Sequence, residues 1–136
     1  MSPPVDDRTL ATVQSHAEEH RQIRKLLEVL RDVDDGAALA TLLDVLDSVM
    51  HEHFAHEEQE QGVFQTVRAG GPALAARIDG FVAEHRVFLA GLEEVRARLE
   101  VEAGEAIDLA RAMGDQLAAH EAAENAAVQA ALRQRD

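Results

Sequence analysis

Four histidines and two glutamates in this chain have types and spacings that suit metal chemistry. They are His20, His53, Glu57, His85, His120 and Glu124. The two glutamates each follow a histidine by four residues, in the pairs His53–Glu57 and His120–Glu124. Residues i and i+4 lie on one helix face, so each pair can reach one metal ion. Four imidazoles and two carboxylates that converge in a helical bundle are the ligand set of a dinuclear non-haem metal site.

The four histidines fall at about the same height of an antiparallel bundle. Chain-breaking residues predict turns at Asp34-Asp35-Gly36, at Gly70-Gly71-Pro72 and around Gly104. Counted from these turns, the histidines of successive helices differ in height by only roughly 4–5 Å, at about 1.5 Å of rise per residue. The ligands are therefore expected to form one layer.

Apolar residues recur every three or four positions in four long segments. This period predicts helices over about residues 7–33, 37–68, from Pro72 to the turn around Gly104, and from that turn to near residue 132. In each segment, ligand residues occupy positions of the apolar stripe. Short connections make neighbouring helices antiparallel, so we expect an all-α, up-down-up-down four-helix bundle.

Composition limits the class of protein. A chain of 136 residues without cysteine is expected to form one domain over residues 1–136, with a short arm at about residues 1–6 and no disulfide or thiolate metal site. The net charge of −13 argues against nucleic acid and anionic membranes as partners. The start Met1-Ser2-Pro3-Pro4 lacks the pattern of a signal peptide, so we expect a cytoplasmic protein.

Burial of these ligands would be costly without a cation. A single histidine on an apolar face is commonly a packed core residue, but glutamate is almost never fully buried unless it is paired. Two glutamates and four histidines on inward faces at one level therefore favour a metal site over a purely structural polar layer. The stretch Glu19-His20-Arg21 also echoes Glu84-His85-Arg86. This echo predicts a pseudo-twofold site in which each half gives two imidazoles to one metal and the glutamates can bridge.

The residues 19–27 and 53–58 resemble the hemerythrin-like family, also called HHE cation-binding domains, and the resemblance extends from about Leu10 to Leu132. It implies a four-helix bundle that holds two iron ions joined by an oxo or hydroxo bridge. By this resemblance, His20 and His53 bind one iron and His85 and His120 bind the other. Glu57 and Glu124 bridge the two.

Two positions depart from the oxygen-carrying members of that family. These have a second histidine where this chain has Leu89, and an aspartate where it has Asn125. The place of the missing histidine is left to water or to another side chain. His16, one turn before His20, is either a further ligand or a buried neighbour. Glu60 is a weaker candidate.

Other polar residues near the ligands are expected to be less involved. His51 points away from the stripe, and His56 lies on its flank. The glutamates adjacent to ligands in sequence should be solvated, although Glu58 can orient a histidine of another helix. They are Glu19, Glu52, Glu58 and Glu84.

These observations predict a di-iron protein that binds or senses O2, peroxide or nitric oxide. An alternative is a di-iron enzyme that degrades peroxide or oxidises iron, although such sites are richer in carboxylate. Zinc or manganese remains a possible occupant of the site. The sequence predicts a small gaseous or peroxide ligand and does not identify a protein partner.

Overall fold

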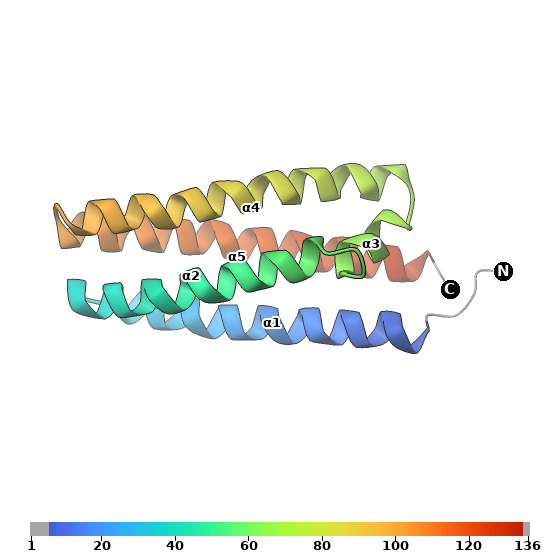
Figure 1. The fold of residues 1–136 in the computed structure, drawn as a ribbon, viewed down its shortest axis with the longest axis horizontal. Coiled ribbons are helices and arrows are strands. Elements are labelled where there is room, and N and C mark those ends of the chain that lie inside the picture. The colour runs from blue at the N-terminus through green and yellow to red at the C-terminus, as the bar shows by residue number, and fades with distance from the viewer. Residues whose placement is uncertain (1–5, 135–136) are drawn as a thin grey trace.

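Five helices make up the part of the chain that the computed structural model describes, residues 6–134 (Figure 1). They are α1 (Asp7–Asp32), α2 (Gly36–Glu58), α3 (Val63–Arg68), α4 (Pro72–Leu99) and α5 (Ala103–Arg133). The four long helices run antiparallel to their neighbours along the chain, and the short α3 lies at the end of the bundle where α1 begins and α5 ends (Figure 1). The predicted all-α, up-down-up-down bundle is confirmed.

Local signals in the sequence set most of the helix ends. Asp6 and Asp35 cap α1 and α2, since their side chains accept from the backbone N–H of residues 9 and 38. Pro72 stands at the start of α4, where its missing N–H is harmless. Gly71 before it has φ 122°, a conformation that favours glycine. Of the arm expected over residues 1–6, only Asp6 lies within the described residues.

The helix predicted over residues 37–68 is wrong in one respect, because it is broken between α2 and α3. The chain turns at residues 59–62, where the N–H of Gly62 donates to the carbonyl of Gln59 at 2.9 Å. A Cβ on Gly62 would lie 2.2 Å from the carbonyl oxygen of His56, so only glycine can approach the end of α2 this closely. The turn carries Glu60 to the surface.

Two apolar clusters fill the bundle on either side of a polar layer. The larger cluster lies towards the α1–α2 and α4–α5 connections and includes Ile23, Leu46 and Leu117. The smaller cluster lies around α3 and includes Phe64 and Ile78. The two clusters therefore hold the intervening polar layer in place from both sides.

No helix within residues 6–134 is long and apolar enough to cross a membrane.

Candidate metal centre

Eight ionisable side chains are buried between the two apolar clusters, each with 6% or less of its surface exposed. They are His16, His20, His53, Glu57, His85, His120, Glu121 and Glu124. They come from all four long helices. Burial of so many charges is unfavourable unless the groups satisfy one another or a cation.

Three histidines surround one oxygen of Glu57. Its Oε2 lies 2.6 Å from His16 Nε2, 3.2 Å from His53 Nε2 and 3.5 Å from His20 Nε2. Glu124 joins this group through Oε1, which lies 3.1 Å from His20 Nε2. One donor atom from each of these five residues lies within 4.8 Å of every other, a spacing that can hold a metal ion.

A second group forms around the other oxygens of the same carboxylates. Glu124 Oε2 lies 3.0 Å from His120 Nε2 and 3.3 Å from His85 Nε2. Glu57 Oε1 lies 3.0 Å from His85 Nε2. Each glutamate thus turns one oxygen to each group of histidines. This is the arrangement that two metal ions bridged by carboxylates require.

Four side-chain acceptors orient four of the histidines by hydrogen bonds to Nδ1, the ring nitrogen that faces away from the centre of the layer. The Nδ1 atoms of His53, His85 and His120 each donate at 2.7 Å to a carboxylate, and Nδ1 of His20 donates at 2.9 Å to an amide oxygen. The acceptors, in the same order, are Glu19, Glu58, Glu84 and Asn125. Such bonds fix the tautomer and leave Nε2 free to face the centre.

The expectation that Glu19 would be solvated is wrong, since only 21% of its side chain is exposed. Glu84 is solvated as expected, with 49% of its side chain exposed, but it also accepts from His120. Their positions on α1 and α4 lie beside a ligand histidine in sequence, but each side chain reaches across to the histidine of the neighbouring helix. Glu58 does the same for His85, as the sequence allowed. Glu52 is solvated as expected, with 70% of its side chain exposed.

Several nitrogen and oxygen atoms of the layer that could bind a metal lack a hydrogen-bond partner among the described residues. They are Nε2 of His20, His53 and His120, Oε1 of Glu57, Oε1 of Glu124 and Oε2 of Glu121. Buried polar atoms without partners are costly and uncommon. Imidazole nitrogens and carboxylate oxygens that face one another without hydrogen bonds suit a cation that all of them can bind. The residues present therefore fit the metal that the sequence predicts.

Protons take part in holding the metal-free cluster together. Burial alone would lower the pKa of His20, but the neighbouring carboxylates of Glu124 and Glu57 outweigh it and raise the pKa to about 10. The same two carboxylates raise the pKa of His85 to about 10 against the effect of burial. Burial alone would raise the pKa of Glu57, but its hydrogen bonds with histidines hold it well below the usual value. A bound metal ion would replace protons here.

Glu121 is a buried member of the layer that the sequence reasoning missed. Its Oε2 lies 3.8 Å from His20 Nε2, and burial raises the pKa of its carboxyl group to about 7. A signal was present, since Leu117, His120, Glu121 and Glu124 follow the spacing of a broad inward face.

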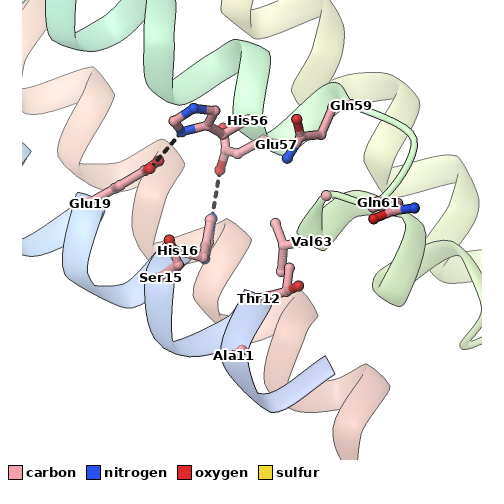
Figure 2. Close-up of a pocket in the computed structure, with 11 residues that line it drawn as sticks. Ala11, Thr12, Ser15, His16, Glu19, His56, Glu57, Gln59, Gln61 and Val63 are labelled. Atoms are coloured by element: carbon pink, nitrogen blue, oxygen red, sulfur yellow. Dashed lines mark hydrogen bonds and ion pairs between the residues drawn. The ribbon is translucent and has the colours of Figure 1, made fainter. Parts of the chain in front are cut away.

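His16 lies at the edge of the buried layer, where two hollows reach it from the surface. Figure 2 shows its ring pointing directly at Glu57, with Nε2 2.6 Å from Glu57 Oε2. Both side chains line a hollow of about 320 Å³, which the turn after α2 borders with Gln59 and Gln61. A second hollow of about 340 Å³ reaches His16 and His20 between α1 and α5. His16 is thus buried and belongs to the five-residue group, as one of its two sequence-based alternatives allowed.

The remaining polar candidates lie outside the layer. His51 has 59% of its side chain exposed, and Glu60 is exposed in the turn between α2 and α3. His56 has 45% of its side chain exposed, and its Nδ1 donates to Glu19 Oε2 at 2.7 Å (Figure 2). Glu19 thereby holds His56 with one oxygen and His53 with the other.

Aromatic rings gather mainly around one of the two histidine groups, and in the other group Phe54 lies 5.9 Å from His53 between ring centroids. All four phenylalanines pack on His85 or His120, with ring centroids 3.8–5.5 Å from one of them: Phe54, Phe64, Phe81 and Phe88. The closest is Phe54, which stacks on His85 at an interplanar angle of 7°. In the other group, the rings near His20 are those of His16 and His53.

Comparison with known proteins identifies one family. The family model for the Hemerythrin HHE cation binding domain matches residues 12–132. No match was found among curated proteins or among solved structures. The matched range contains every residue of the buried layer.

Proposed function

The chain belongs to the hemerythrin HHE cation-binding family, and on this premise we propose that it is a non-haem di-iron protein that binds or senses O2, peroxide or nitric oxide. One observation carries the proposal. Glu57 and Glu124 each turn one oxygen to the group of His20 and the other to that of His85. A cluster with a single metal would not need both carboxylates divided in this way.

The donor set favours iron. Imidazole and carboxylate ligands bind iron in either of its common oxidation states, and the chain has no cysteine that would recruit a softer metal. Bound iron would supply the redox-active centre at which a small ligand binds. Zinc or manganese can use the same donors, so metal analysis is part of the test.

The protein's own residues supply position and exclusion of water. Hydrogen bonds to Nδ1 hold the histidines with Nε2 towards the centre before any metal arrives. The two apolar clusters close the layer from both ends of the bundle. These features support a centre that reacts with small molecules that can pass between packed helices.

Anaerobic reconstitution with iron tests the proposal. We expect two irons per chain, and optical spectra that change on addition of O2, peroxide or nitric oxide. His53→Ala and His120→Ala should each lose most of the metal, whereas the control His51→Ala should keep it, because only His51 is exposed.

Two results would contradict the proposal. One is a single metal ion per chain. The other is equal loss of metal in all three variants, which would show that the layer is not the binding site. Steady turnover of peroxide by the loaded protein would instead support the enzymatic alternative.

A further inference from the structure

The two halves of the bundle repeat one another around the metal layer. Corresponding positions lie 65 residues apart between α1 and α4, and 67 apart between α2 and α5, as the numbers of His20 and His85 and of His53 and His120 show. Glu57 corresponds to Glu124 by the same offset. The core donors of the two halves are thus identical in type.

The supporting hydrogen bonds repeat as well. Glu19 accepts from His53 at 2.7 Å, and its counterpart Glu84 accepts from His120 at 2.7 Å. The remaining two acceptors, Glu58 and Asn125, also correspond in position and hold His85 and His20. The two halves are therefore related by their contacts and not only by their sequence.

The first break in this symmetry lies at His16, whose counterpart on α4 is Phe81. The two rings occupy similar places, since the centroid of His16 lies 5.6 Å from that of His53, and Phe81 lies 5.5 Å from His120. His16 brings a nitrogen to 2.6 Å from Glu57 Oε2. Phe81 has no donor atom to offer.

The second break lies at Glu121, whose counterpart on α2 is Phe54. The Glu121 carboxylate comes to 3.8 Å from His20 Nε2. Phe54 instead stacks its ring on His85 with centroids 3.8 Å apart. At both places, the polar residue lies beside His20, and its aromatic counterpart lies beside His85 or His120.

The two metal positions consequently differ in their protein donors. The first has three imidazoles, from His16, His20 and His53, and one oxygen from each glutamate, which makes five. The second has two imidazoles, from His85 and His120, and one oxygen from each glutamate, which makes four. The second position is one donor short of the first.

We propose that the exogenous ligand binds at the metal held by His85 and His120, and that His16 closes the other metal to it. This inference rests on the proposed di-iron function and specifies which of the two metals is open. The rings of Phe54 and Phe81 make the surroundings of the open position apolar. Such surroundings favour a small, weakly hydrated ligand such as O2 or nitric oxide over a strongly hydrated anion.

The hollow beside His16 is lined by His16 and Glu57, and neither His85 nor His120 borders it. Its inner wall is formed by His16 and Glu57 (Figure 2). A molecule that enters it meets an imidazole already directed at the centre. The competing interpretation is that His16 yields its place to the ligand, and the experiment must separate the two.

Exchange of the two symmetry-related rings provides that experiment. Phe81→His adds the missing donor to the second position, and His16→Phe removes the extra donor from the first. Phe81→Leu is the matched control, because it removes the ring without adding a nitrogen. Each protein is loaded anaerobically with ⁵⁷Fe, its iron content is measured, and Mössbauer spectra are recorded before and after addition of nitric oxide.

We expect nitric oxide to change the signal of one of the two irons in the unaltered protein and in Phe81→Leu. Phe81→His should lose this response while it keeps two irons. His16→Phe should show a response at both irons, which decides the question even if Phe81→His fails to fold. The double variant should regain a response at a single iron.

Two outcomes would overturn the inference. One is an unchanged nitric oxide response in Phe81→His with two irons bound. The other is loss of the response in His16→Phe, which would mean that the ligand depends on the first position. If the unaltered protein fails to bind two irons or shows no response at all, the proposed function itself fails, and the inference with it.

Discussion

The two sides of the ligand layer are built from the same donors but lie in different surroundings. On the α1 side, His16 and Glu121 add polar groups, and two hollows reach the layer from the surface. On the α4 side, Phe81 and Phe54 stand at the corresponding positions and the remaining phenylalanines complete an aromatic wall. A repeated motif of histidine and glutamate can therefore produce two unequal groups of donors through changes at neighbouring positions of the same helices.

We expect the largest effect from substitution of a carboxylate that both sides of the layer share. Glu57→Ala removes the group that faces His16, His20, His53 and His85. We expect loss of both metals and a fall in the free energy of unfolding of about 3–5 kcal/mol, the usual effect of removing one partner from a buried ion pair. Iron analysis and chemical denaturation measure the two effects.

Glu52→Ala is the control for that variant, since the Glu52 side chain is largely exposed on the same helix. It should retain the metal and change stability little. If Glu57→Ala kept one full equivalent of iron, the carboxylate would not be shared between the two sides.

Removal of the metal should destabilise both sides without unfolding the chain. Binding to the native state alone adds stability, about 3–4 kcal/mol when free metal exceeds its dissociation constant by 100- to 1,000-fold. The apolar clusters on either side of the layer remain in the metal-free protein. Circular dichroism melts of the two forms provide the measurement. An unfolded metal-free chain would show that the clusters are too weak alone, and identical melts would argue against a buried site.

The metal-free protein should lose stability as pH rises from about 6.5 to about 10. The pKa values of His20 and His85 are raised from 6.5 to about 10, so each favours the folded state below 6.5 and loses that contribution as pH rises through 10. The raised pKa of Glu121, about 7, acts in the same direction between 4.5 and 7. Denaturation at pH 6, 8 and 9.5 measures the trend.

Metal should weaken or reverse that trend, because it replaces the protons that the histidines hold. The variant Glu121→Gln separates the two sides, because it removes a titrating group from the α1 side only. This variant should flatten the fall in stability of the metal-free protein below pH 7 and leave the fall above it. A metal-free protein that gained stability between pH 6.5 and 10 would contradict the assignment.

The smallest expected effects come from the orienting carboxylates. Glu19→Gln and Glu84→Gln each replace a charged acceptor of a histidine Nδ1 with a neutral one. We expect metal affinity to fall by about 10-fold, at the lower end of the range for such partners. Glu19→Gln should affect the α1-side metal and Glu84→Gln the other. Competitive titration with a chelator checks both, and no change relative to Glu52→Gln would show that these bonds do not tune the site.

The helices and the level of the ligands could be predicted from sequence because both follow from periodicity. His20, His53, His85 and His120 stand at apolar positions and at similar distances from the turns, and they lie in one buried layer. The family resemblance is confirmed by the match over residues 12–132. The assignment of two irons to these residues stays a prediction.

The break after α2 could not be seen in the same way. Residues 59–62 carry no apolar residue, but Glu57 and Phe64 are seven residues apart, which is also the spacing of two helical turns. The structure shows that a Cβ on Gly62 would meet the carbonyl oxygen of His56 at the end of α2. A glycine within a periodic stretch signals a turn only when its three-dimensional neighbours are known.

Periodicity also could not predict the hydrogen bonds that Glu19 and Glu84 make to histidines of neighbouring helices. Glu19 and Glu84 are offset from the inward face, but long side chains at the edge of a helix can reach a neighbour that the sequence does not place. The inequality of the two sides was hidden for a related reason. The offset of 65 residues pairs His16 with Phe81, but the contacts of the two rings show that they stand at matching places beside His53 and His120.

A crystal structure of the iron-loaded protein, with anomalous scattering measured at the iron edge, tests the proposed two-iron site most directly. We expect two iron peaks in one buried layer, one beside His16, His20 and His53 and the other beside His85 and His120. Glu57 and Glu124 should each give one oxygen to each iron. A single iron peak, or either glutamate turned to solvent, would show that the two carboxylates do not bridge a pair of irons.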